Sequence, residues 1–259
     1  MMSLLAEERK KRIIEIVNNE GQVKVNNLAK IFKVSTETIR RHLEELESEQ
    51  KIRKVHGGAV RVEEDSNELS MFKRRILHID QKIIIGLKAA SFVEDGEVIF
   101  IDEGSTTLQM ASSIKRKKGV TVITNSFPFA AKLMEYEDNE HPFKGEMIFL
   151  GGHVKGDHFR TSGSLAEKMA KELFVDKAFI SIDGLDYHAG ITSYDLDKCM
   201  LSNIFMANAK QSYILSDSSK IGNIANYKIQ DLSEVNYIIT NVPYVKDFGI
   251  NDSKWIQAD

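Results

Sequence analysis

Several polar segments in the later part of the sequence follow short apolar runs and have the composition of a ligand-binding loop. The clearest is residues 102–107, Asp-Glu-Gly-Ser-Thr-Thr, which come directly after the apolar run 98–101. Ligands gather at the carboxyl ends of strands in open α/β sheets, and a loop that opens a helix presents amides and hydroxyls to a phosphate. We therefore expect a phosphate group at this loop, with candidate ligand residues Asp102, Gly104, Ser105, Thr106 and Thr107.

Similar polar or glycine-containing segments end other predicted strands and are expected to line the same crevice. Their candidate residues are Asn125, Gly151, Gly152, Asp183 and Lys220, of which Lys220 would supply a positive charge for a phosphorylated ligand. Taken one at a time, each segment is more simply interpreted as an ordinary strand end or helix cap. Glu103 fits less well, because a carboxylate beside a phosphate is repulsive unless its side chain points away.

A second group of candidate residues lies near the N-terminus, where the pattern predicts two helices joined by a short connection. Ser35 can cap the first turn of a helix, and the recurrence of Ile39, Leu43 and Leu46 gives that helix one buried stripe. A shorter amphipathic helix precedes it, and the two-residue connection 33–34 is typical of a helix-turn-helix. The outward face of the second helix is polar and locally basic, and its candidate DNA-contacting residues are Ser35, Thr36, Glu37, Thr38, Arg40 and Arg41.

A hairpin is predicted after this helix, because residues 51–55 and 59–62 are typical of short strands around His56-Gly57-Gly58. It would form a wing, from which Arg53, Lys54 and His56 reach DNA phosphates. Residues 1–62 hold 13 of the 35 Lys and Arg but only 9 of the 38 Asp and Glu, which leaves 22 against 29 for the remainder. Positive charge is therefore concentrated at the predicted DNA-binding end, although an ordinary solvated surface would also carry such charges.

The run VSTETIRRHLEELESEQKIRKVHGGA, residues 34–59, resembles the winged helix-turn-helix signature of DeoR-type bacterial repressors of sugar metabolism. The sequence departs from the usual pattern at three positions. His42 stands where the family tends to have Asp, Gln50 where it tends to have Gly, and Lys54 where Arg is usual. His42 follows the two arginines of the predicted reading helix. We therefore expect this protein to read a DNA sequence that differs from those read by other members of the family.

From residue 82 onward, predicted helices alternate with apolar strands, as expected of a mostly parallel sheet with helices on its faces. The polar segments after these strands resemble, in order, those of the DeoR-type sensor domain, which is similar to the ribose-phosphate-isomerase-like fold. This resemblance implies a sugar-phosphate effector. It implies that Asp102 bonds sugar hydroxyls, that residues 104–107 hold the phosphate, and that Lys220 pairs with its charge.

The sequence predicts two domains, because 259 residues of ordinary globular composition exceed what one small domain needs. Residues 1–62 are predicted as the winged helix-turn-helix domain, 63–80 as a linker with an acidic start, and 81–259 as the α/β sensor domain. A single cysteine excludes an internal disulfide. No signal peptide or bilayer-length apolar segment is recognised, so a cytoplasmic protein without membrane contact is expected. His153 and His158 lack a clear third ligand, and neither a metal nor a cofactor is predicted.

These observations favour a transcriptional regulator rather than an enzyme, most plainly a repressor of a carbohydrate-utilisation operon. Its expected partners are double-stranded operator DNA, a phosphorylated sugar effector and further copies of itself in a dimer or tetramer. Paired reading helices would meet half-sites about one helical turn apart, and effector binding would release the DNA. One alternative is a sugar-phosphate isomerase or hydrolase with Asp102 or Asp183 as base and an accessory DNA-binding domain. Another is an activator, since the sign of regulation depends on where the operator lies.

Overall fold

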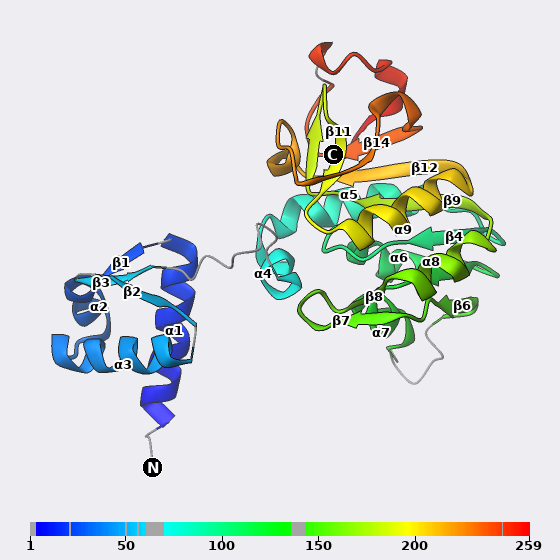
Figure 1. Ribbon diagram of the computed structural model, residues 1–259. Coiled ribbons are helices and arrows are strands. Elements are labelled where there is room, and N and C mark those ends of the chain that lie inside the picture. The colour runs from blue at the N-terminus through cyan, green and yellow to red at the C-terminus, as the bar shows by residue number, and fades with distance from the viewer. Residues whose placement is uncertain are drawn as a thin grey trace. The chain divides into compact units, whose positions relative to one another are not determined.

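The computed structural model describes residues 4–20, 22–49, 51–55, 57–60, 70–135, 143–244 and 246–259. The chain divides by its internal contacts into two compact units, Met1–Ser66 and Asn67–Asp259 (Figure 1). Residues 71–76 and 79–80, predicted as parts of a linker, belong to helices α4 (Met71–Ile76) and α5 (Ile79–Ser91) of the second unit. The side chain of Met71 is buried in the core of that unit, so this part of the chain is packed structure rather than a free connection.

The first unit combines helices with a small antiparallel sheet around one apolar core. Its described elements are α1 (Leu4–Glu20), β1 (Gln22–Lys24), α2 (Val25–Phe32), α3 (Thr36–Ser48), β2 (Arg53–Val55) and β3 (Gly58–Val60), with sheet order β1-β3-β2. The predicted stripe of α3, Ile39, Leu43 and Leu46, is buried against α1 and α2 residues such as Ile13 and Leu28. Ile31 of the amphipathic helix α2, by contrast, is exposed. Gly21, which follows α1 in the sequence, lies outside the described residues.

The connection between α2 and α3 is made by a left-handed residue followed by a helix cap. Lys33 has φ 51°, and the amide of Val34 donates to the carbonyl of Ala29 at 3.1 Å. Ser35 is extended, and its Oγ accepts a hydrogen bond from the amide of Thr38 at 3.1 Å. This bond satisfies one of the free amides of the first turn. The predicted start of the helix at Ser35 is therefore confirmed.

Replacing Ser35 by alanine is expected to destabilise the first turn of α3 by about 1 kcal/mol, because it removes the cap acceptor. Amide exchange of residues 36–42 in the full-length protein should become about fivefold faster when local opening governs exchange. Ser48→Ala is the matched control, since Ser48 Oγ donates to the Glu45 carbonyl at the other end of the helix. Equal acceleration by both variants would show that the cap has no special contribution.

The predicted wing forms as the hairpin β2–β3, with pairs Arg53↔Val60, Lys54↔Ala59 and Val55↔Gly58. Gly57 in its turn has φ +81°, a conformation that favours glycine. Strand β1, which the sequence did not predict, pairs with the other edge of β3. A Cβ at Gly58 would lie 2.0 Å from the carbonyl oxygen of Val23, so this close approach needs glycine.

The second unit is built on a sheet that has seven strands in the described part of the chain. They are β4 (Val98–Ile101), β5 (Thr121–Thr124), β6 (Glu146–Phe149), β9 (Val175–Ser181), β12 (Ala209–Ser216), β14 (Tyr237–Thr240) and β15 (Trp255–Gln257). Their order is β15-β14-β12-β9-β4-β5-β6, and every pairing between them is parallel. The predicted fold class, a mostly parallel α/β domain, is confirmed.

Helices cover both faces of this sheet, which explains why its strands are almost continuously apolar (Figure 1). Ile99 and Ile101 of β4 pack on the side of α5, η1 (Thr107–Met110), α6 (Ala111–Ile114) and α7 (Phe127–Met134). Phe100 packs on the opposite side with α8 (Ser164–Lys171) and α9 (Leu196–Ala207), where its ring stacks on Phe205. The helix predicted directly after residue 107 is thus a 3-10 turn followed by one α-helical turn.

Short antiparallel elements beside the main sheet were not predicted. They are β7 (His153–Lys155), β8 (Arg160–Ser162), β10 (Gly184–Asp186), β11 (Gly190–Ser193) and β13 (Tyr227–Gln230). The remaining 3-10 turns are η2 (Gly156–His158), η3 (Ser218–Lys220), η4 (Leu232–Glu234), η5 (Lys246–Phe248) and η6 (Asp252–Lys254). Within the residues that the structure describes, no helix combines the length and apolar character needed to cross a bilayer.

Candidate functional site

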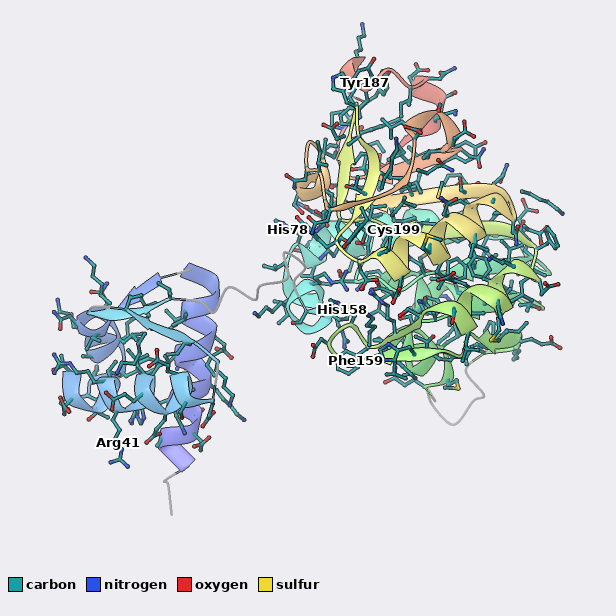
Figure 2. All side chains as sticks on the ribbon, in the orientation of Figure 1. Arg41, His78, His158, Phe159, Tyr187 and Cys199 are labelled. Atoms are coloured by element: carbon teal, nitrogen blue, oxygen red, sulfur yellow. The ribbon has the colours of Figure 1, made fainter. Side chains whose placement is uncertain are left out.

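The outward face of α3 presents two arginines that only weak surface pairs restrain. The side chain of Arg40 is 59% exposed and lies 3.2 Å from Glu37, and that of Arg41 is 75% exposed and lies 3.2 Å from Glu45. Figure 2 shows Arg41 extending away from α3. Exposed pairs of this kind contribute only about 0.2–1 kcal/mol, so both guanidinium groups can exchange their carboxylate for another acceptor.

His42 lies on the packed side of α3, not beside the two arginines. It is buried, and its Nε2 lies 3.1 Å from a guanidinium nitrogen of Arg9 on α1. Burial lowers the pKa of His42, and the nearby positive charge of Arg9 lowers it further. His42 therefore takes part in the contact between α1 and α3. The expectation that it alters the reading face directly is not supported by its position.

The wing is tied to α3 by Lys54. Its ammonium lies 2.9 Å from Glu44, and its backbone amide donates to Glu47 at 2.8 Å. The side chain of Arg53 and all of His56 lie outside the described residues, so their expected phosphate contacts stay predictions. The same holds for the expected DNA contacts of Ser35, Thr36, Glu37 and Thr38, of which Ser35 and Thr38 also bond to each other through their hydroxyls at 2.8 Å.

In the second unit, a cavity of about 200 Å³ opens at the carboxyl ends of β4, β9 and β12. Five of the residues predicted to bind a ligand line it: Gly104, Ser105, Thr106, Asp183 and Lys220. The other lining residues are Arg74, Leu77, His78, Lys82, Ser181, Ile182, Asp217 and Ser219. The parallel sheet thus brings together loops that are more than a hundred residues apart in the sequence, as expected for this fold class.

Hydrogen-bond donors on the loop after β4 are free to face a ligand. Among the described residues, the amides and hydroxyls of Ser105 and Thr106 make no hydrogen bond, although both residues are largely buried. Thr107 has a different task, because its hydroxyl bonds to the carbonyls of Asp102 and Gly104 at 3.0 and 3.1 Å and shapes the loop. A Cβ at Gly104 would lie 2.3 Å from Ser181 Oγ, so the loop can pass close to β9 only with glycine.

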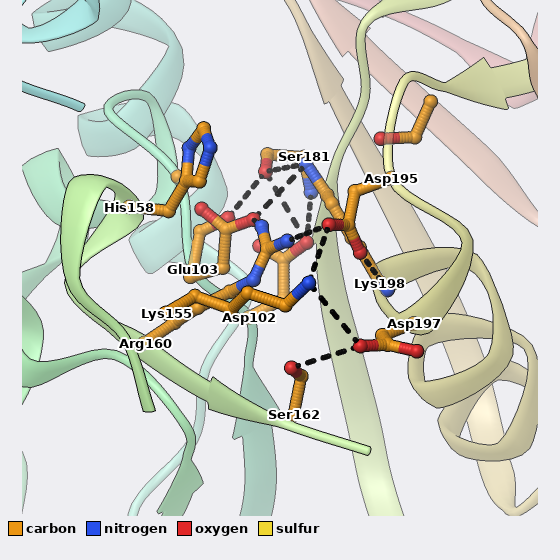
Figure 3. A network of polar contacts seen from close by, with 12 residues as sticks. Asp102, Glu103, Lys155, His158, Arg160, Ser162, Ser181, Asp195, Asp197 and Lys198 are labelled. Atoms are coloured by element: carbon orange, nitrogen blue, oxygen red, sulfur yellow. Dashed lines mark hydrogen bonds and ion pairs between the residues drawn. The ribbon is translucent and has the colours of Figure 1, made fainter. Parts of the chain in front are cut away.

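Glu103 does not line the cavity but belongs to a buried ion-pair cluster formed by Glu103, Arg160, Lys198, Asp183 and Arg74. Figure 3 shows Glu103 beside Arg160 and Lys198. Glu103 is paired with Arg160, and the two side chains are 1% and 0% exposed. Arg74 lies 3.3 Å and Lys198 3.7 Å from the same carboxylate. Burial by itself raises the pKa of Glu103, but the charges of Lys198, Arg160 and Arg74 outweigh it and lower the pKa to about 2. The Glu103 carboxylate therefore lies among three cations and off the cavity wall.

Asp183 connects this cluster to the cavity. Its carboxylate accepts from Ser193 Oγ at 2.6 Å and lies 3.9–4.0 Å from Lys198, Arg74 and Lys220. Burial opposes ionisation, yet the three cations hold the pKa of Asp183 far below its usual range. The ionised Asp183 carboxylate attracts Lys220, which also lines the cavity.

Asp102 lies behind the cavity rather than on its wall. Its Oδ2 accepts from the Ser181 amide at 2.9 Å and from Ser181 Oγ at 3.2 Å, while its Oδ1 is buried without a partner. Burial raises the pKa of Asp102 to about 8, although Lys198 acts in the opposite direction. The expected bonds from Asp102 to sugar hydroxyls stay a prediction that this position does not favour.

Asn125, Gly151 and Gly152 do not line the cavity, contrary to the expectation. The Asn125 side-chain amide donates to the Thr161 carbonyl at 2.9 Å, which fixes β8 against the end of β5. A Cβ at Gly152 would lie 2.6 Å from the Ser162 carbonyl oxygen, so this glycine permits the hairpin β7–β8 to close. Asn125 and Gly152 thus support β8, the strand that carries Arg160.

The sequence reasoning missed four cations: Arg74, Lys82, Arg160 and Lys198. Arg74 and Lys82 line the cavity, and Arg160 and Lys198 belong to the buried ion-pair cluster. Three of them lie on predicted helical or linker segments, where a charged residue is usually solvated, and Arg160 lies on an unpredicted strand. The one signal in the sequence was the presence of carboxylates, such as Asp102 and Glu103, directly after apolar strands. Carboxylates buried there need cations nearby.

Two family models match the chain. A DeoR-like helix-turn-helix domain matches residues 9–65, and a DeoR C terminal sensor domain matches residues 77–242. An uncharacterized HTH-type transcriptional regulator, YulB, of Bacillus subtilis is 34% identical over 92% of this chain and 90% of its own length. The HTH-type transcriptional regulator GlpR of Haloferax volcanii is 29% identical over 92% and 91%.

A putative aga operon transcriptional repressor of Escherichia coli O157:H7 is 27% identical over 90% of this chain and 86% of its own length. Among solved structures, a ribose 5-phosphate isomerase of Methanocaldococcus jannaschii is similar with a TM-score of 0.39 and 20% identity, over 55% of this chain and 54% of that one. A likeness at this level supports no conclusion about activity.

Proposed function

This chain belongs to the DeoR family of transcriptional regulators, and we propose that it represses a carbohydrate-utilisation operon and releases its operator when a phosphorylated sugar binds. Arg40 and Arg41 of α3 enter the major groove, and Lys54 and the other basic residues of the wing contact flanking phosphates. A dimer or tetramer supplies paired reading helices to half-sites about one helical turn apart.

One observation supports the effector class most directly. The cavity joins the free amides and hydroxyls of Ser105 and Thr106 to the ammonium groups of Lys82 and Lys220. Several oriented N–H and O–H donors with two cations form the environment that a phosphate oxygen prefers. The volume of about 200 Å³ suits a small ligand. In this proposal, the phosphate lies at Ser105 and Thr106, and the sugar lies towards Asp183.

The arrangement argues against the enzymatic alternative. Asp183 was the candidate base on the cavity wall, but its neighbouring cations hold its pKa far below its usual range, which makes it a weak base. Asp102 has the more suitable pKa, about 8, yet its carboxylate is bonded to Ser181 behind the wall. The relatives over most of the chain are named as transcriptional regulators.

Binding of the full-length protein to its own upstream DNA tests the proposal. Affinity should fall steeply with salt, because basic side chains displace counterions from phosphates. A panel of sugar monophosphates should contain a compound that weakens binding by roughly 5–150-fold, the range of ordinary coupling free energies, while the unphosphorylated sugars should not. Transcription in vitro from the same region should decrease with the protein and recover with that compound.

Lys220→Met should abolish the effector response and leave DNA binding intact. Lys228→Met is the matched control, because Lys228 is an exposed lysine paired with Asp231 and does not line the cavity. Specific DNA binding that no sugar phosphate changes would remove the proposed effector class. An increase in transcription with the protein would identify an activator.

A further inference from the structure

Helix α4 is held to the second unit by a side chain that also lines the cavity. The guanidinium of Arg74 lies 3.3 Å from Glu103 and 4.0 Å from Asp183, and Arg74 is itself buried. His158 of η2 lies 3.4 Å from the same guanidinium. With Met71 buried in the core, Arg74 fixes this short helix on the sensor.

Lys82 of α5 holds the other end of α4. Its ammonium donates to the carbonyl of Arg74 at 2.6 Å and to that of Leu77 at 2.7 Å. The last carbonyls of a helix have no partner inside the helix, so Lys82 serves as its cap. An ammonium has three N–H donors, and these two bonds leave one for a ligand in the cavity that Lys82 lines.

The ammonium of Lys82 is less favoured in this cavity than in water. Burial lowers the pKa of Lys82 to about 8, and the neighbouring cations Lys220 and Arg74 also lower it, whereas Asp217 raises it. A ligand phosphate in this cavity would favour the charged ammonium. The charged form is the one that bonds both carbonyls most strongly.

We propose that Lys82 and Arg74 contact the anionic group of the bound ligand and thereby make the docking of α4 depend on whether the cavity is occupied. This inference rests on the proposed function and names the regulation of its site. An occupied cavity strengthens the bonds of Lys82 to the end of α4 and adds bonds from Lys82 and Arg74 to the ligand. By linkage, a firmly docked α4 also raises the affinity for the ligand.

Helix α4 lies in the sequence between the DNA-reading unit and the core of the sensor, so its docking can affect both. It is the first described helix after residues 61–69, which follow the wing in the sequence. Docking of α4 therefore sets where, in the sequence, the sensor begins after the DNA-reading unit. The ligand acts through a difference in its affinity for the docked and undocked forms.

Hydrogen–deuterium exchange of the full-length protein tests the coupling. The amides of Arg74 and Leu77, which donate to the Ser70 and Lys73 carbonyls, report the opening of α4. With a saturating sugar monophosphate, exchange over residues 71–78 should slow by roughly tenfold. The unphosphorylated sugar should have no effect, and inorganic phosphate alone distinguishes an effect of the anion from one that needs the sugar.

Lys82→Gln is the decisive variant, with Arg74→Gln as a second one in case the first does not fold. In both, we expect the ligand still to bind through Ser105, Thr106 and Lys220, as titration calorimetry would show, but protection of α4 on binding should be lost. Arg75→Gln is the matched control on the same helix, because Arg75 is exposed and does not line this cavity; it should respond as the natural protein does.

Ligand binding without any change in the exchange of α4 overturns this inference and leaves the proposed function standing. The inference is also overturned if ligand binding slows the exchange of α4 in Lys82→Gln as much as in the natural protein. If no sugar phosphate binds at all, the proposed function and this inference fall together.

Discussion

Arg160→Met is expected to lower the free energy of unfolding of the second unit by roughly 3–5 kcal/mol, the usual cost of removing one partner from a buried ion pair. The side chain of Arg160 is 0% exposed, and it pairs with Glu103 and, at 2.7 Å, with Asp195. Methionine fills similar space but leaves the carboxylate of Glu103 without its nearest cation. Desolvation of that carboxylate then opposes folding.

Urea denaturation followed by tryptophan fluorescence measures this effect. The sequence has a single tryptophan, Trp255, which is buried in β15 and therefore reports on the second unit. The matched control is Lys155→Met, because Lys155 is more exposed and lies 3.7 Å from Asp195 and 3.6 Å from Asp197. Its loss should cost less than about 1 kcal/mol.

Removing the buried negative charge as well should restore part of the stability that Arg160→Met loses. In Arg160→Met with Glu103→Gln, the unpaired buried charge is gone, and stability should recover by more than the two single effects predict when added. Equal losses in Arg160→Met and Lys155→Met, or strict additivity in the double variant, would contradict a buried pair between Arg160 and Glu103.

The elements that could be predicted are those whose cause is local. Ser35 caps α3 with an amide three residues away, so the start of the helix is visible in the sequence. Residues 98–101 are apolar because both faces of β4 are covered, and such a run predicts an interior parallel strand. The order of loops at the carboxyl edge then followed from the fold class, which placed Ser105, Asp183 and Lys220 together.

The parts that could not be predicted depend on contacts between distant residues. Arg160 meets Glu103 across 57 positions, and Arg74 meets it across 29. No periodicity records such a pair, and a lone arginine or lysine on a helix is ordinarily exposed. Asn125 and Gly152 illustrate the opposite error. Their types suit a ligand loop, but they hold the hairpin β7–β8, a short antiparallel element without a clear pattern.

Arg40→Ala is expected to weaken operator binding by roughly 1–3 kcal/mol and to relax the base preference at one position of each half-site, as the loss of a bidentate arginine–guanine contact would. Arg41→Ala should also weaken operator binding and should relax the base preference at a neighbouring position. Folding should be little affected, because the pair of Arg40 with Glu37 is exposed. Binding of the full-length protein to a library of single-base operator variants measures both the affinity and the preference.

Two control variants distinguish base-specific recognition from non-specific electrostatic binding. Arg12→Ala removes the same charge from an exposed position on α1, outside the predicted reading face, and should change affinity little and base preference not at all. Lys54→Ala should weaken all operators alike and reduce the salt dependence by about one phosphate contact. If Arg40→Ala instead weakens every operator equally, Arg40 contacts a phosphate. If Arg40→Ala changes neither affinity nor preference, Arg40 does not contact the operator. Arg41 is then the remaining long basic side chain on the outward face of α3.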